Sequence, residues 1–350
     1  MVLIEVKNLV KKYGNHLAVD HLNFKIESGR IYGFLGPNGA GKSTTMNIMT
    51  GYLGATEGEV FINGHNILKE PEEAKKHIGY LPEQPPLYMD MTVREYLEFA
   101  AELKGIKKAK REDEITEVEK LVKIKDVEHR LIKNLSKGYR QRVGLAQAVL
   151  GFPEIIILDE PSVGLDPKQI IEIRELIRKL AKKHTVILSS HILAEVREVC
   201  DHILIISKGK LVASDTPENL ERLLGEHNVV EIEAEASPSD IRLVLKNVPG
   251  IEKIDIKENG EETSTAFIHE KKGEDVRLSV FRAFASAGIP LLTLKASGTT
   301  LEDVFMELTQ SDTVPEALAK KGGWVEVQTA DSKSNSQEQG EEVQENAGDL

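Results

Sequence analysis

A glycine-rich loop between an apolar run and a helical run constrains this chain more than any other feature. The loop follows the run RIYGFL and precedes TMNIMTG. Its glycines let the backbone curl so that N–H groups face one point, and the helix that starts there adds its positive end. A following lysine and serine suit phosphate oxygens and a Mg²⁺ ion. The residues assigned to this phosphate site are Gly36, Pro37, Asn38, Gly39, Ala40, Gly41, Lys42, Ser43 and Thr44.

Apolar runs along the first two thirds of the chain indicate an α/β fold. The runs at 154–161 and 185–191 are short and almost wholly apolar, which is typical of strands buried on both faces of a parallel sheet. Helical stretches lie between the strands. Residues 92–104 open with threonine and carry glutamate three positions later, a capping box. A second long helix is expected after Pro167, and this alternation predicts helices covering a sheet.

An acidic pair follows the apolar run at 154–158. Ligands of open α/β sheets bind at the carboxyl ends of the strands, and Asp159 and Glu160 lie at such an end. Asp159 can hold Mg²⁺ through water, and Glu160 can act as the general base for a water that attacks the γ-phosphate. The alternative is a helix cap, against which Pro161 argues.

Composition bears on nucleic-acid binding, disulfide formation and membrane association. The net charge of −12 provides no overall basic surface for nucleic acid. The single cysteine, Cys200, rules out a disulfide within the chain and is expected to be a buried apolar residue. No apolar window of eighteen residues occurs, so we expect membrane association only through a partner chain.

The last third of the sequence changes in pattern. Residues 228–309 indicate strand, helix, two strands, helix, strand and helix, and the first six match a small α+β, ferredoxin-like order. This segment shows no nucleotide or metal motif. The polar, acidic tail at 312–350 is predicted to be disordered.

Taken in order, these motifs resemble the ATP-binding subunit of an ABC transporter. More narrowly, the chain is similar to bacterial ABC-2 or multidrug-type subunits, including those of the gliding-motility kind. The resemblance covers residues 1–225 and implies a P-loop NTPase (ABC ATPase) domain with a helical subdomain at about 85–150. Residues 228–309 resemble the C-terminal accessory domain that some of these subunits carry.

The segment LSKGYRQ at 135–141 stands where the family has its signature, usually LSGGQ. The resemblance implies that two subunits pack head to tail around two ATP molecules. Ser136, Lys137 and Gly138 would then contact the ATP held by the partner subunit. Lys137 and Tyr139 depart from the usual signature, and their effect on affinity and rate stays open.

Four further residues are assigned through the resemblance alone. Tyr13 matches the aromatic residue that stacks on adenine, and Gln84 matches the glutamine that touches Mg²⁺ or the attacking water. The alternatives are strand packing for Tyr13 and an ordinary loop glutamine. Asp166 belongs to the loop that signals across the dimer and joins the set facing the partner's ATP. His191 matches the histidine that contacts the γ-phosphate.

The resemblance implies hydrolysis of Mg-ATP that powers transmembrane transport, in the direction of export. Glu160, His191 and Gln84 are the expected catalytic residues, and ATP and Mg²⁺ are the cofactors. The expected partners are a second copy or a paralogous ATPase subunit and a polytopic permease, which would hold the protein on the cytoplasmic face of the cell membrane. The first alternative is a non-transport ABC ATPase acting on DNA or ribosomes; the acidic charge and the single phosphate loop disfavour it. The second, a P-loop kinase, leaves the signature and His191 without a role.

Overall fold

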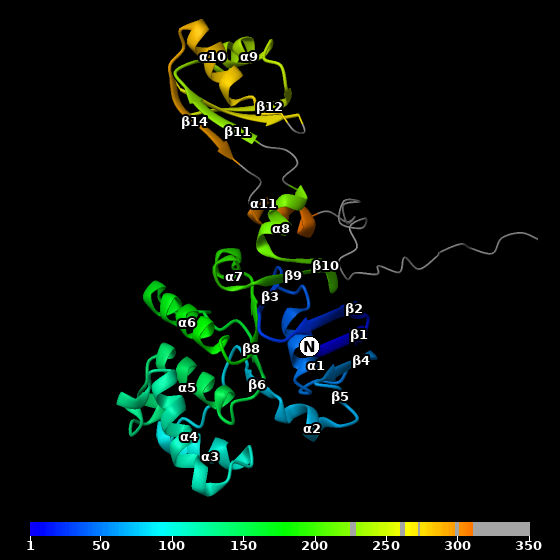
Figure 1. Ribbon diagram of the computed structural model, residues 1–350, viewed down its shortest axis with the longest axis vertical. Helices are drawn as coiled ribbons and strands as arrows, with labels where there is room; N and C mark the ends of the chain where they lie inside the picture. The colour runs from blue at the N-terminus through cyan, green and yellow to red at the C-terminus, as the bar shows by residue number, and fades with distance from the viewer. Residues whose placement is uncertain (225–228, 260–262, 272–273, 298–300, 311–350) are drawn as a thin grey trace, which may run out of the picture.

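The computed structural model describes residues 1–224, 229–259, 263–271, 274–297 and 301–310 (Figure 1). The tail predicted to be disordered, 312–350, lies outside the described residues.

A six-stranded sheet in the order β10-β9-β3-β8-β7-β6 forms the centre of the larger part of the molecule. The pairs β9–β3, β3–β8, β8–β7 and β7–β6 are parallel, and β10 pairs antiparallel with β9. Every residue of β7 and β8 is buried, which confirms the expectation of parallel strands covered on both faces. The strands are β3 (Ile31–Leu35), β6 (Ile78–Leu81), β7 (Ile155–Leu158), β8 (Thr185–Ser190), β9 (His202–Ser207) and β10 (Lys210–Asp215).

A second, antiparallel sheet in the order β2-β1-β4-β5 covers one side of the central sheet. One buried apolar cluster joins both sheets and helix α1, and includes Phe24, Phe34 and Met46. The elements of this layer are β1 (Val2–Tyr13), β2 (His16–Glu27), α1 (Lys42–Met49), β4 (Glu57–Ile62), β5 (His65–Asn66) and α2 (Pro71–Lys76).

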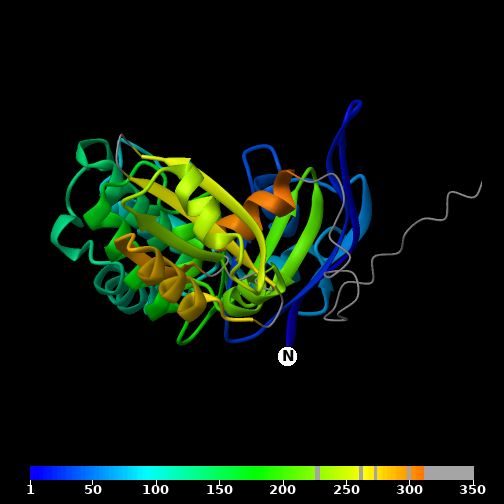
Figure 2. The ribbon, with the colours of Figure 1, turned by 90° about the horizontal axis from the view of Figure 1, so that it is seen from above.

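Helices cover the opposite side of the central sheet, and both views place α3 to α5 away from the β1–β5 layer (Figures 1 and 2). The expected capping box is present on α3: Glu95 N donates to Thr92 Oγ1 at 3.3 Å, and Thr92 N donates to Glu95 Oε2 at 2.8 Å. Cys200 is buried as expected, and burial raises the pKa of its thiol. The elements are α3 (Val93–Leu103), α4 (Lys108–Leu121), η1 (Lys125–Val127), η2 (Ile132–Asn134), α5 (Lys137–Val149), α6 (Pro167–Leu180) and α7 (Leu193–Val199). Among the described residues, no helix combines the length and the apolar character needed to cross a membrane.

A smaller antiparallel sheet has the order β12-β13-β11-β14. Its apolar residues share a separate buried cluster with two helices, and this cluster includes Val230, Ile268 and Phe284. The elements are β11 (Val229–Ala234), α9 (Pro238–Leu245), β12 (Ile251–Glu258), β13 (Ser264–Glu270), α10 (Arg277–Ala287) and β14 (Leu291–Ser297).

The final described helix returns to the larger part of the molecule. Helix α11 (Leu301–Gln310) packs against α8 (Pro217–Leu224) and β9 (Figure 1). Leu308 and Leu220 are buried in the same apolar cluster as the helices beside the central sheet, and Phe305 packs against it. Thus α11, apart from its last residue, lies within the range 228–309 predicted for the accessory domain, yet it contributes to the core of the larger part.

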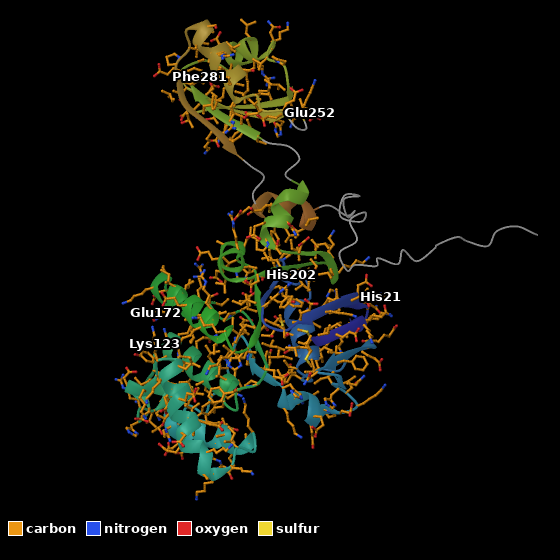
Figure 3. The ribbon with its side chains drawn as sticks, viewed as in Figure 1. His21, Lys123, Glu172, His202, Glu252 and Phe281 are labelled. Carbon is orange, nitrogen blue, oxygen red and sulfur yellow. The ribbon has the colours of Figure 1, made fainter. Side chains whose placement is uncertain are left out.

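His202, labelled in Figure 3, is the half-buried first residue of β9. His202 Nε2 lies 2.9 Å from Ser214 Oγ on β10, and its ring centroid is 5.4 Å from that of Tyr32 on β3. Burial in this position lowers the pKa of His202, because the charged imidazolium loses its contact with water.

Candidate nucleotide-binding site

The loop between β3 and α1 depends on its glycines. Gly39 and Gly41 have φ of 79° and 104°, the left-handed region that other residues avoid. At Gly36, a Cβ atom would lie 2.3 Å from Ile206 O, so only glycine fits there without movement of the backbone. Gly41 is also the N-cap residue of α1. The loop can therefore pass close to β9 and deliver its amides to the start of the helix.

Lys42 is the first residue of α1, and its side chain folds back over the loop. Its Nζ donates to Gly36 O at 2.8 Å and to Pro37 O at 3.3 Å. The same nitrogen lies 3.6 Å from Glu160 Oε1 at the end of β7. Carbonyl oxygens and a carboxylate thus hold a buried ammonium group at the mouth of the loop, where a phosphate can replace these partners.

Asp159 lies behind this ammonium group, at the end of β7. Ser43 Oγ donates to Asp159 Oδ1 at 3.2 Å, and Ser189 Oγ donates to the same oxygen. Burial raises the pKa of Asp159, and the two hydroxyl groups oppose that shift. The side-chain oxygens of Ser43 and Asp159 are donors that suit Mg²⁺.

The described residues contain no cluster of three or more His, Cys, Asp or Glu side chains that could hold a metal ion by themselves. Mg²⁺ commonly binds through one or two carboxylates together with substrate phosphates. The donors present therefore fit a Mg²⁺ ion that arrives with a nucleotide.

Glu160 sits in an unusual backbone conformation. Its φ is 48°, a left-handed value that costs a residue with a side chain about 1–2 kcal/mol. Glu160 N donates to Ser189 Oγ at 2.9 Å, and Glu160 Oε2 lies 2.9 Å from His191 Nδ1. Because β7 and β8 are neighbours and end at the same edge, the pair meets although 31 residues separate it in sequence.

These groups border a cavity of about 450 Å³, a volume that suits a small-molecule ligand. Tyr13 and His16 are cross-strand partners where β1 turns into β2, and both line the cavity. The lining residues are Tyr13, His16, Ala18, Asn38, Gly39, Ala40, Gly41, Lys42, Ser43, Thr44, Glu83, Glu160, Val163 and His191.

The loop after β6 differs from the expectation. Both Glu83 and the predicted Gln84 are exposed, but of the two only Glu83 lines the cavity. Glu83 and Gln84 lie in a bend after β6, and the course of this bend decides which of the two side chains faces the site. The sequence analysis did not single out Glu83. A carboxylate just after a parallel strand could have indicated it, because ligands bind at the carboxyl ends of such strands.

The residues expected to face a partner gather at a second place, where α5 and α6 begin. Ser136 Oγ accepts from Tyr139 N at 3.4 Å, and Asp166 Oδ1 accepts from Gln169 N at 2.9 Å, so both cap helices. A Cβ atom at Gly138 would lie 2.7 Å from the Gln169 side chain, which shows how closely the two helix starts approach. None of the residues predicted to face the partner's ATP, namely Ser136, Lys137, Gly138 and Asp166, lines the cavity of its own chain.

A phosphate loop ahead of α1, a buried lysine and an acidic pair at the end of β7 define this protein as a P-loop ATPase. The family model for ABC transporters matches residues 19–163. The chain is 36% identical over 315 residues to the bacitracin transport ATP-binding protein BcrA of Bacillus licheniformis, covering 89% of this chain and 99% of BcrA. It is 38% identical over 310 residues to the uncharacterized ABC transporter ATP-binding protein YhcH of Bacillus subtilis, covering 88% and 96% of the two chains.

Solved structures agree with these relatives. The structure of an ATP-binding subunit of an ABC transporter superposes with a TM-score of 0.59 at 32% identity, covering 64% of this chain and 93% of that one. A dimeric ATP-binding cassette in a post-hydrolysis state with ADP and phosphate gives 0.56 at 28% identity, covering 61% and 98%. The chain belongs to the family of ABC transporter ATP-binding proteins, and it is an ATPase subunit.

Proposed function

We propose that this chain hydrolyses ATP to power an exporter, as one half of an ATP-bridged dimer attached to a polytopic permease. The export direction is supported by relatives whose names describe drug transport or resistance. Besides BcrA, the linearmycin resistance ATP-binding protein LnrL of Bacillus subtilis is 29% identical over 88% of this chain. In this proposal the protein works on the cytoplasmic face of the membrane, with a second copy or a paralogous ATPase subunit.

ATP would enter the cavity with its phosphates on the loop and its base toward Tyr13. Lys42 would leave the carbonyl groups of Gly36 and Pro37 and pair with the β- and γ-phosphates. Ser43 and Asp159 would hold Mg²⁺, which neutralises charge on the phosphate oxygens. The share in Mg²⁺ binding predicted for Gln84 stays a prediction, because Gln84 does not line the cavity.

The single observation that carries the catalytic proposal is the position of Glu160. Its carboxylate is buried between Lys42 and His191, at 3.6 Å and 2.9 Å. A general base within reach of the γ-phosphate can take the proton of the attacking water, while His191 orients that carboxylate and contacts the γ-phosphate. The left-handed backbone at Glu160 also supports a catalytic role for this residue, since strained backbone conformations cluster at active sites.

The second subunit would complete the site. Ser136, Lys137 and Gly138 form the start of α5 in one subunit and would face the γ-phosphate held by the other, with Asp166 beside them. ATP would then bind the closed dimer better than the open one, and loss of the γ-phosphate would reopen it. The dimeric cassette with ADP and phosphate described above supports a dimer that holds nucleotide.

The helical layer and the small sheet have separate proposed roles. Tyr88 and Met89 lie exposed just before α3 in the part predicted as the helical subdomain, and apolar side chains there suit contact with a membrane partner. The order β11-α9-β12-β13-α10-β14 and the strand order of its sheet support a ferredoxin-like accessory domain. We assign this domain to bracing or regulation of the dimer.

Replacing Glu160 by glutamine tests the catalytic proposal. The Glu160→Gln protein should bind Mg-ATP and form a stable dimer in light scattering, while hydrolysis falls about 10²–10⁴-fold. Glu154→Gln is the matched control, because Glu154 is exposed at the opposite end of β7. Turnover by Glu160→Gln at the parent rate would remove Glu160 from the role of base. Purification of the native complex with a polytopic membrane protein, and not with DNA or ribosomes, tests the transport proposal.

A further inference from the structure

Glu195 is a buried carboxylate close to the nucleotide site that the proposed mechanism does not use. It lies in the first turn of α7, where the positive end of the helix favours a negative charge. Its Oε2 atom accepts hydrogen bonds from Ser162 Oγ and, at 3.4 Å, from Ser190 Oγ. Within the described part of the chain, no basic side chain forms an ion pair with it. Two hydroxyl groups from different segments therefore share one oxygen of this carboxylate.

The hydroxyl group of Ser190 fixes the end of strand β8. Ser189 and Ser190 are the last two residues of β8, and consecutive side chains of a strand point to opposite faces. Ser189 faces the acidic pair at the end of β7. Ser190 faces Glu195 on the other side, and its Oγ also accepts from Ile192 N at 3.0 Å. The strand is therefore held on both faces immediately before His191.

The hydroxyl group of Ser162 fixes the loop between β7 and α6. Ser162 lies two positions after Glu160 and four positions before Asp166, the N-cap residue of α6. Leu165 N donates to Ser162 O at 3.2 Å, so the loop turns back on itself at this point. The bond from Ser162 to Glu195 therefore anchors the segment that connects the proposed base to the residue expected to face the partner.

We propose that Glu195 is a positioning residue that fixes His191 relative to the loop that carries Asp166. This inference rests on the proposed function, in which His191 contacts the γ-phosphate of its own subunit and Asp166 faces the ATP of the partner. Glu195 itself does not line the nucleotide cavity. Its loss should therefore leave the binding of ATP to one subunit unchanged and slow the hydrolysis that needs both subunits.

The expected effect on the rate is large because one carboxylate holds two segments. A hydrogen bond to a charged group corresponds to a factor of about 10–100 in an equilibrium constant. A catalytic group displaced by about 1 Å can cost about 10²-fold in rate. Without the carboxylate, the hydroxyl groups of Ser162 and Ser190 lose their shared acceptor, and His191 loses its fixed place relative to Asp166.

The test measures steady-state ATP hydrolysis by Glu195→Ala, Glu195→Gln and the parent. In Glu195→Ala, kcat should fall about 10–100-fold. The affinity of single subunits for a fluorescent ATP derivative, measured at protein concentrations too low for dimers, should stay as in the parent. Glu195→Gln should restore most of the rate, because an amide oxygen can accept both serine hydrogen bonds. A residue that only packed α7 against its neighbours would not produce this separation of rate from affinity.

The two serines provide a second test that removes no charge. Ser162→Ala and Ser190→Ala should each lower kcat in the parent, and neither should lower it further in Glu195→Ala, because residues that act through one contact are not additive. These two variants decide the question alone if Glu195→Ala does not fold. Losses of rate that simply add would contradict the proposal.

Glu198→Ala is the matched control, because Glu198 is exposed on the same helix and pairs with Arg174 of α6. It removes the same charge and one contact between α7 and α6, and kcat should stay unchanged. The proposal is overturned if Glu195→Ala turns over ATP as fast as Glu198→Ala does, if its ATP affinity falls together with the rate, or if Glu195→Gln is as slow as Glu195→Ala. If the parent hydrolyses no ATP, the proposed function fails before this inference is reached.

Discussion

Replacing Leu308 by alanine should destabilise the nucleotide-binding part of the protein. Leu308 follows the small sheet in sequence, so its position in the chain alone would suggest an effect on that sheet instead. Leu308 lies on α11 with 2% of its surface exposed, and Leu220 of α8 is fully buried. Both belong to the apolar cluster that includes Ala213 of β10 and Leu176 of α6. Removing the Leu308 side chain would open a cavity beside the central sheet, whereas the core of the small sheet is a separate cluster.

The size of the effect follows from that burial. A buried leucine replaced by alanine costs about 2–5 kcal/mol, and the upper values apply where the surroundings cannot collapse. A domain of this size loses about 2–4 °C in melting temperature per kcal/mol. The melting temperature of the nucleotide-binding part should therefore fall by about 4–20 °C.

Differential scanning calorimetry with and without Mg-ATP provides the assay. The transition that ATP stabilises belongs to the nucleotide-binding part, and this transition should move in Leu308→Ala. Glu302→Ala is the control, because Glu302 is exposed on the same helix. If the ATP-sensitive transition of Leu308→Ala stayed within the spread of this control, α11 would not belong to that core.

Two further predictions concern single side chains. Lys42→Ala removes a charged hydrogen-bond donor worth about 1.5–3 kcal/mol, so ATP affinity measured by calorimetric titration should fall about 10–100-fold; unchanged affinity would exclude Lys42 from phosphate binding. Burial lowers the pKa of His202 below its value in the unfolded chain, about 6.5. The unfolded chain therefore takes up the proton first as pH falls, and stability that is fully present above that pKa is lost below it. The drop in melting temperature between about pH 7.5 and pH 5.5 should thus be smaller in His202→Gln, and an equal drop in both proteins would contradict this account.

Local patterns in the sequence were sufficient for the strand, loop and helix around Lys42 and for the strand that ends at Asp159. Parallel strands end at one edge of the sheet, so the meeting of Lys42 with Glu160 also follows from the sequence once the fold class is known. The choice between Glu83 and Gln84 does not follow, because it depends on the bend of the chain after β6. The sequence predicted a last helix within 228–309 but not its packing partner, since an amphipathic helix has the same pattern whichever core it covers.

The backbone angle at Glu160 has a consequence for the stability of the whole protein. Glycine adopts a φ near 48° without cost, whereas glutamate is held there by its own N–H bond to Ser189 and by the contacts of its side chain. The backbone conformation of Glu160 therefore lowers the free energy of unfolding, while its side chain is needed for ATP hydrolysis. Selection for heat resistance alone would favour glycine at that position, and the resulting protein would keep its nucleotide pocket but lack the group that consumes the nucleotide.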